Sequence, residues 1–190
     1  MPVVSFNFST LKKLTMKKLL VIAVAIFFCF SVIAQTTINR DPEIEKMVSE
    51  VSKDSLQSYI KKLVSLGTRN TLSTQTDPAR GIGAARNWVL NRFNEFARQS
   101  NGRLSAFIDT TTLQPDGRRV DVPLLLGNVV ATLKGTDPND NRIFIISGHL
   151  DNMRTNVMDR IGDAPGANDV RSGTAAVLLC ARIRSSHSFP

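Results

Sequence analysis

The sequence predicts an α/β fold in which helices pack on a β-sheet, and three observations support this prediction. Two stretches with helical periodicity, residues 42–66 and 81–96, precede the segments with strand character. Those segments are residues 105–113, 124–134 and 142–147. The last of them leads through a loop into a further helical stretch, and this order of elements is typical of layered α/β proteins.

The helices are predicted from the spacing of their apolar residues. Between residues 42 and 66 these residues mostly recur every three or four positions, which fits one amphipathic helix or two helices broken near Lys53 and Asp54. The next helix begins near Gly81, and we expect its apolar face to pack on the sheet. That face consists of Ile82, Ala85, Val89, Phe93 and Phe96.

The later elements are predicted from composition. Residues 105–113 are rich in threonine, and a turn at residues 115–117 separates them from the next strand. The apolar, β-branched run within residues 142–147 is typical of a strand buried on both faces. Residues 172–184 have helical character. One side of that helix carries Ala175, Ala176, Leu179 and Ile183.

The first 34 residues have the features of a secretory signal peptide. Two lysines precede an uncharged apolar run at residues 19–30, and small residues suited to cleavage follow before Gln35. A start at Met16 would give a signal of ordinary length, with residues 1–15 as an upstream extension. We expect residues 35–190 to be secreted or periplasmic after cleavage.

A single-pass membrane anchor is the alternative for this segment. The apolar stretch at residues 19–34 has 16 residues, and a bilayer-spanning helix needs about 20. We therefore expect cleavage and no membrane attachment afterwards. Lipid attachment at Cys29 is disfavoured because Phe27 and Phe28 stand where a lipidation site requires small residues.

The chain has a formal net charge of +8, from 24 Lys and Arg residues against 16 Asp and Glu residues. Four of the lysines lie in the predicted signal, which leaves 20 basic and 16 acidic residues in the mature part. This excess is small and dispersed, so we expect no nucleic-acid partner. Cys180 is the single cysteine after the signal, so the mature chain cannot form an intrachain disulfide.

Three residues in two short motifs are suited to metal chemistry. His149 and Asp151 follow the segment 142–147, and the carboxyl ends of buried strands in α/β sheets face the crevice where ligands bind. The Asp151 carboxylate can fix the tautomer and orientation of the His149 imidazole, a ligand that suits zinc. Asp169 precedes the last helical stretch, whose amino-terminal end favours a nearby anion.

Together these residues would supply half of a two-metal hydrolase site. In such a site, ions about 3.5–4 Å apart polarise the scissile carbonyl and activate a water. The spacing alone leaves a second interpretation open, in which His149 and Asp151 form a hydrogen bond at a strand end and Asp169 caps a helix.

The order of the motifs resembles a known family. The chain reads NVVATLKG at residues 128–135, IISGHLD at 145–151, APGAND at 164–169 and SGTA at 172–175. This series is similar to the zinc-dependent aminopeptidase family that includes the bacterial leucyl aminopeptidases and the glutaminyl cyclases. The likeness covers most of residues 41–183.

The resemblance implies a mixed β-sheet flanked by helices, incomplete at the carboxyl end. It implies an exported aminopeptidase that releases amino-terminal residues from peptides, with residues 35–190 as the amino-terminal portion of its peptidase domain. By the same resemblance His149 is a terminal ligand of one zinc, Asp151 supports His149, and Asp169 bridges two zinc ions. Neither the resemblance nor the composition indicates an oligomeric state.

The sequence departs from the family pattern after Asp169. The family usually has a second Asp and a small residue there, whereas this chain has Val170 and Arg171. The family takes its general-base Glu and its remaining ligands from further along, but residues 170–190 contain no Asp or Glu. Their one histidine, His187, is expected at the surface without a metal role. We therefore expect weak or absent zinc binding, no peptidase turnover and an exposed sheet edge.

Two other functions remain open. The first is a glutaminyl cyclase-like acyltransferase, which uses one zinc ion to cyclise an amino-terminal Gln. The second is a non-catalytic exported interaction domain that keeps a peptidase-like shell, for which Val170 and Arg171 would be a sign of relaxed constraint.

Overall fold

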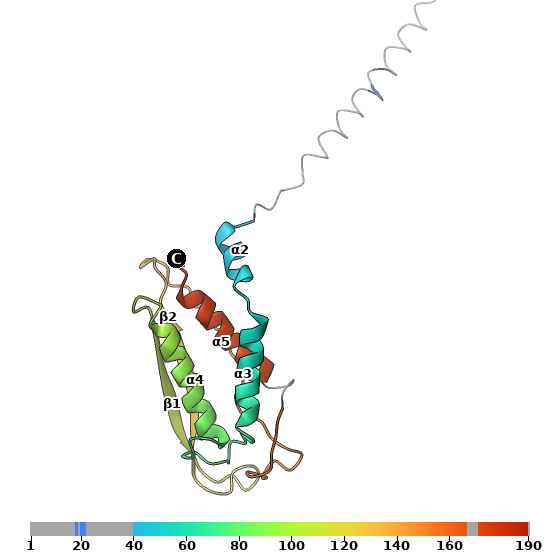
Figure 1. Ribbon diagram of the computed structural model, residues 1–190, viewed down its shortest axis with the longest axis vertical. Coiled ribbons are helices and arrows are strands. Elements are labelled where there is room, and N and C mark those ends of the chain that lie inside the picture. Colours follow the sequence, from blue (N-terminus) through green and yellow to red (C-terminus); the bar gives the residue numbers. More distant parts are fainter. Residues whose placement is uncertain (1–17, 19, 22–39, 167–170, 190) are drawn as a thin grey trace, which may run out of the picture. The chain divides into compact units, whose positions relative to one another are not determined.

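The computed structural model describes residues 18, 20–21, 40–166 and 171–189. The elements in chain order are α2 (Pro42–Ser49), α3 (Lys53–Ser65), α4 (Gly81–Ala97), β1 (Leu104–Leu113), β2 (Leu124–Leu133) and α5 (Arg171–Ser185) (Figure 1). This architecture confirms the α/β class. Most of the predicted signal peptide lies outside the described residues. In the part of the chain that is described, no helix is long and apolar enough to cross a membrane.

The amphipathic stretch at residues 42–66 forms two helices, with the break at the position that the sequence suggested. Helix α3 begins after Ser52, whose hydroxyl oxygen accepts the backbone N–H of Ser55 at 3.1 Å. Tyr59 and Leu63 are buried, so α3 contributes to the core. Helix α2 buries no residue, and its isoleucine and valine side chains are exposed.

The apolar face predicted for α4 is confirmed, because all five of its residues are buried. Helix α4 packs against β1, β2 and α5, and α5 also packs against α3 (Figure 1). On α5, Ala176 is exposed, and Leu178 is buried beside Ala175, Leu179 and Ile183. The buried face of α5 therefore turns slightly from the expected one.

The two strands form an antiparallel hairpin, in register from the pair Leu104 and Leu133 to the pair Leu113 and Leu124. The turn predicted at residues 115–117 lies in the connection between them. The Asp116 carboxylate accepts three backbone N–H bonds, and they lower its pKa to about 2 because they stabilise the charged form. The donors are Val120, Arg118 and Arg119.

The buried strand predicted at residues 142–147 is wrong. The sheet of the described residues contains only β1 and β2, and Ile145 is 86% exposed. A strand needs a neighbouring strand about 4.8 Å away. Here a cavity separates the segment from β2, so its apolar residues have no partner strand to cover them.

The surface position predicted for His187 is also wrong. Its side chain is 5% exposed, and its Nε2 lies 3.1 Å from Oε1 of Glu50. The backbone oxygen of His187 accepts a hydrogen bond of 2.5 Å from the guanidinium of Arg103. The end of α5 thus packs on residues that follow α2, a contact across more than a hundred residues that local sequence does not reveal.

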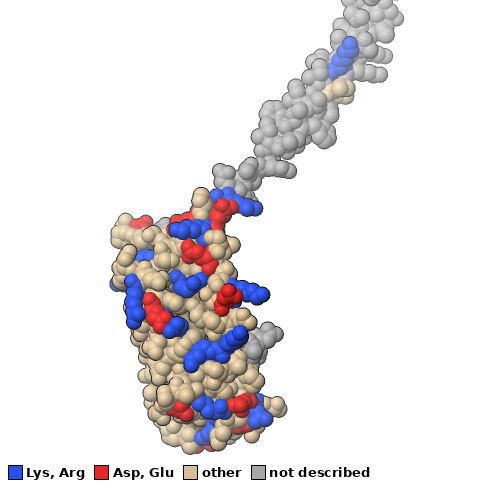
Figure 2. Space-filling model, viewed as in Figure 1, with Lys and Arg blue, Asp and Glu red and all other residues tan. Residues whose placement is uncertain are grey.

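Charged side chains are interspersed on the face that Figure 2 shows. Lys and Arg alternate there with Asp and Glu, and apolar or neutral surface separates the groups. This face therefore carries no extended patch of one sign, the usual footprint of a nucleic-acid surface.

Candidate metal centre

His149 and Asp151 lie on a loop that follows the extended residues 143–147. Their side chains are 63% and 53% exposed, and Nδ1 of His149 lies 3.4 Å from Oδ1 of Asp151. The carboxylate therefore faces one ring nitrogen and leaves Nε2 accessible to a metal ion. The structure places the two side chains together as the sequence predicted, and their roles in metal binding stay predictions.

The buried side chain of Arg69 holds this loop in place through a hydrogen bond to its backbone. Arg69 is 0% exposed, and its Nε donates a hydrogen bond of 2.7 Å to the backbone oxygen of Leu150. A second guanidinium nitrogen donates to the backbone oxygen of Leu63 at 3.2 Å. Because Leu150 stands between His149 and Asp151, Arg69 fixes the backbone from which both side chains project.

Asn152 joins three chain segments beside the candidate site. Its Oδ1 accepts the backbone N–H of Arg69 at 2.7 Å, and its Nδ2 donates to the backbone oxygen of Ala164. Its own N–H donates to the backbone oxygen of Arg69 at 3.2 Å. The Asn152 side chain is buried, so these bonds replace water at both of its polar ends.

The first turns of α5 pack directly against the loop of His149. A β-carbon added to Gly148 would lie 2.8 Å from the carbonyl carbon of Gly173, so this approach requires glycine. The hydroxyl of Thr174 donates a hydrogen bond of 2.9 Å to the backbone oxygen of His149. The loop and the helix are therefore held together by a close backbone contact and by a side chain to backbone hydrogen bond.

Asp169, the predicted bridging ligand, lies outside the described residues, as does Val170. Before this gap in the sequence, the backbone oxygen of Ala164 accepts a hydrogen bond from Asn152. After it, the hydroxyl of Thr174 in α5 donates a hydrogen bond to the backbone oxygen of His149. Across residues 18, 20–21, 40–166 and 171–189, no three His, Cys, Asp or Glu side chains gather as a group able to hold a metal ion.

The sequence did not identify three residues that position the loop. Arg69 ends the sequence LGTR at residues 66–69, within the range that the resemblance covers, but a buried role for its charge was not predicted. Asn152 directly follows the HLD sequence, and Thr174 lies in SGTA. The contacts of Thr174 with His149, of Arg69 with Leu150 and of Asn152 with Arg69 join residues 25, 81 and 83 positions apart, so local patterns could not assign them.

Replacing Asn152 with alanine is expected to lower the free energy of unfolding by about 2 kcal/mol. The reason is that the change leaves the N–H of Arg69 and the carbonyl of Ala164 buried without these bonds. Urea denaturation followed by circular dichroism measures the loss. Asn139→Ala, at an exposed asparagine, is the matched control, and an equal effect of both changes would contradict the role assigned to Asn152.

Comparison with known proteins finds a family model that includes the loop of His149 and several relatives that match most of the chain. Residues 128–189 match the model of Peptidase family M28. A probable zinc metalloprotease of Pyrenophora teres f. teres is 45% identical over 144 residues, which are 75% of this chain and 31% of the relative. One from Pyricularia oryzae is 43% identical over 143 residues, 75% of this chain and 28% of the relative.

A leucine aminopeptidase 1 of Grosmannia clavigera is 27% identical over 143 residues, again 75% of this chain and 31% of the relative. No solved structure matches the chain. The chain spans about a third of the length of the curated relatives that it matches. These matches confirm the resemblance to zinc-dependent peptidases, and the names of the relatives refer to zinc.

Proposed function

We propose that the chain is the amino-terminal part of an exported zinc-dependent aminopeptidase of family M28. One observation carries the proposal: the His149 and Asp151 pair lies within residues 128–189, which match the family, on a loop that buried side chains hold in place. The leucine aminopeptidase of Grosmannia clavigera supports the aminopeptidase activity. The signal-like residues 1–34 support export.

Each site residue has a proposed role in zinc binding. His149 binds zinc through Nε2, while Asp151 faces Nδ1 and keeps the ring in the tautomer and orientation that a metal ligand needs. Asp169 would supply a carboxylate ligand for the metal. Zinc, when bound, polarises the carbonyl of the peptide substrate and activates a water. Arg69 and Asn152 are positioning residues, because they hold the loop and reach His149 only through its backbone.

A zinc titration of the 190-residue chain by calorimetry tests the proposal. We expect weak binding, because His149 and Asp169 are fewer protein ligands than the three or four usual for zinc. His149→Ala should abolish the binding, and Asp151→Asn should weaken it about 10- to 100-fold by removing the support of the ring. Asp109→Asn, an exposed carboxylate on β1, should leave it unchanged.

Two results would contradict this proposal. The first is zinc binding that His149→Ala leaves intact, because the metal would then sit elsewhere. The second is zinc binding that Asp151→Asn leaves at full strength, because the carboxylate would then not support the His149 ring. Tight binding of two ions per chain would support the family assignment and overturn the expectation of a weak site.

A further inference from the structure

The carboxylate of Asp151 contacts a different side chain with each of its two oxygens. Its Oδ1 lies 3.4 Å from Nδ1 of His149, and its Oδ2 accepts a hydrogen bond of 3.4 Å from the hydroxyl of Thr71. Thr71 stands 80 residues earlier, in the connection between α3 and α4. A distant segment therefore determines which oxygen of Asp151 faces the histidine ring.

An aspartate needs such a second contact to keep its carboxylate in one orientation. The last torsion of its side chain has broad, roughly twofold preferences, so a single weak contact leaves the carboxylate free to turn. A hydroxyl that donates to Oδ2 restricts this rotation and leaves the lone pairs of Oδ1 for the N–H of the His149 ring. With the proton on Nδ1, the ring nitrogen Nε2 is unprotonated and can bind a metal ion.

The backbone around Thr71 is fixed by hydrogen bonds on both sides. Before it, Nδ2 of Asn70 donates to the backbone oxygen of Val157 at 2.9 Å. After it, the hydroxyl oxygen of Ser73 accepts the N–H of Ile82 in α4 at 2.9 Å. The N–H of Ser73 also donates to the backbone oxygen of Asn70 at 2.8 Å. The hydroxyl of Thr71 is therefore held in place before any ligand binds.

A chain of polar side chains continues from Thr71 to the sheet. Nε2 of Gln75 donates to the backbone oxygen of Thr71 at 3.2 Å, and Oε1 of Gln75 accepts a hydrogen bond from Arg86. The guanidinium of Arg86 also donates to the backbone oxygen of Leu125 in β2 at 3.1 Å. Arg86 is buried, and this burial lowers its pKa because it disfavours the charged form. Helix α4 and strand β2 thus both anchor the segment that carries Thr71.

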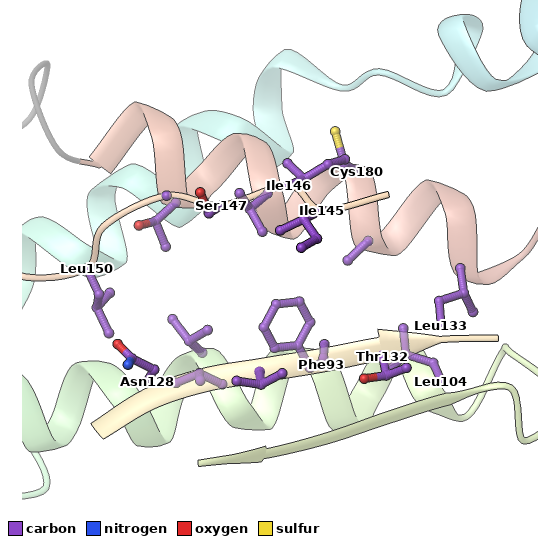
Figure 3. Close-up of a pocket in the computed structure, with 18 of the residues that line it drawn as sticks. Phe93, Leu104, Asn128, Thr132, Leu133, Ile145, Ile146, Ser147, Leu150 and Cys180 are labelled. Atoms are coloured by element: carbon purple, nitrogen blue, oxygen red, sulfur yellow. The ribbon is translucent and has the colours of Figure 1, made fainter. Parts of the chain in front are cut away.

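Thr71 stands out as a polar residue in mainly apolar surroundings. It lines the cavity between β2 and the His149 loop, together with His149 and Asp151. Figure 3 shows the apolar part of this cavity, into which Leu150 and Phe93 point. The hydroxyl of Thr71 is therefore placed where the carboxylate of Asp151 needs a donor.

We propose that Thr71 is a positioning residue of the candidate metal centre, whose hydroxyl orients the Asp151 carboxylate so that His149 keeps its proton on Nδ1. The importance of this contact for zinc rests on the proposed function. Its effect on the His149 ring, in contrast, exists in the chain without metal. Gln75 acts one step further away, because it bonds to the backbone of Thr71.

Nitrogen NMR of the metal-free 190-residue chain tests the proposal, because the nitrogen shifts of an imidazole distinguish its two tautomers. The chain has two histidines, so a His149→Ala spectrum assigns the signals of His149. At about pH 9, above the range in which histidine usually changes charge, we expect Nδ1–H to be the main tautomer. Thr71→Val keeps the shape of the side chain without the hydroxyl. It should lower the ratio of Nδ1–H to Nε2–H by about 2- to 10-fold, the effect of one hydrogen bond.

Matched variants separate the hydroxyl from other effects of the substitution. Thr71→Ser keeps the hydroxyl and should keep the tautomer ratio of the unchanged chain. Thr110→Val makes the same change at an exposed threonine of β1 and should leave the ratio unaltered. Circular dichroism checks the fold of each variant. Should Thr71→Val unfold, Thr71→Ala removes the same hydroxyl with a smaller side chain and is expected to give the same shift.

Four results would overturn the proposal. They are Nε2–H as the main tautomer of the unchanged chain, no change in Thr71→Val, an equal loss in Thr71→Ser, and an equal loss in Thr110→Val. Zinc calorimetry of the same variants tests the proposed function separately, since Thr71→Val should weaken zinc binding by the same factor. A changed tautomer ratio with unchanged zinc affinity would support the role of Thr71 and contradict the role of His149 as a zinc ligand.

Discussion

Replacing Arg69 with methionine is expected to lower the free energy of unfolding by about 3–5 kcal/mol. Methionine keeps much of the buried volume but removes two charge-assisted hydrogen bonds, each worth about 1.5–3 kcal/mol. Those bonds reach the backbone of Leu150 and of Leu63, which are far apart in the sequence. Chemical denaturation followed by circular dichroism measures the change.

A second measurement, of hydrogen exchange, distinguishes local loosening of the His149 loop from destabilisation of the whole fold. Under native conditions, hydrogen exchange of residues 149–152 should speed up more than that of α4, because Arg69 bonds directly to this loop. Arg98→Met is the control, since Arg98 is exposed at the end of α4. If both arginine changes alter the free energy of unfolding by only about 0.5 kcal/mol, the usual size of a surface effect, Arg69 does not hold the loop.

Replacing Leu178 with alanine is expected to cost about 3–5 kcal/mol. Leu178 is fully buried in the cluster that α5 shares with α4 and β1, which also contains Phe93 and Leu104. Truncation removes transfer free energy and leaves a cavity that neighbours fill only in part, as in other buried Leu→Ala changes of about 2–5 kcal/mol. The midpoint and slope of urea denaturation measure the loss.

The half-exposed Leu125 on β2 provides the matched control for Leu178. Leu125→Ala should change the free energy of unfolding by less than about 1 kcal/mol, because it leaves no buried cavity. Similar costs for the two changes would mean that the cluster around α5 is not closely packed. A change in the denaturation slope would indicate that the truncation had loosened the folded state.

The sequence predicted the helices better than the third strand, and the reason is physical. The face of α4 is a repeat within one helix, so the spacing of Val89 and Phe93 already identifies it. The apolar run at residues 142–147 indicates that these side chains favour burial, but it does not indicate which strand would cover them. A strand is defined by its neighbour, which local sequence does not contain.

In the candidate site, too, features set by nearby residues could be predicted, and those set by distant contacts could not. His149 and Asp151 are two positions apart, and their proximity could be predicted because the chain itself keeps them close. The burial of Arg69 and the pairing of His187 with Glu50 depend on contacts across 81 and 137 residues. Arg and Glu side chains are usually exposed and His is intermediate, so the sequence does not predict burial for Arg69 or His187 until the fold is known.

The contact between Gly148 and Gly173 bears on the order in which the site assembles during folding. His149 and Thr174 are 25 residues apart, whereas Arg69 and Leu150 are 81 residues apart. Closing the shorter loop costs less chain entropy, and contacts of short separation form faster. The topology therefore favours an order in which α5 first docks on the loop of His149. The hydrogen bond from Arg69 to Leu150 then forms on a loop whose conformation is already set.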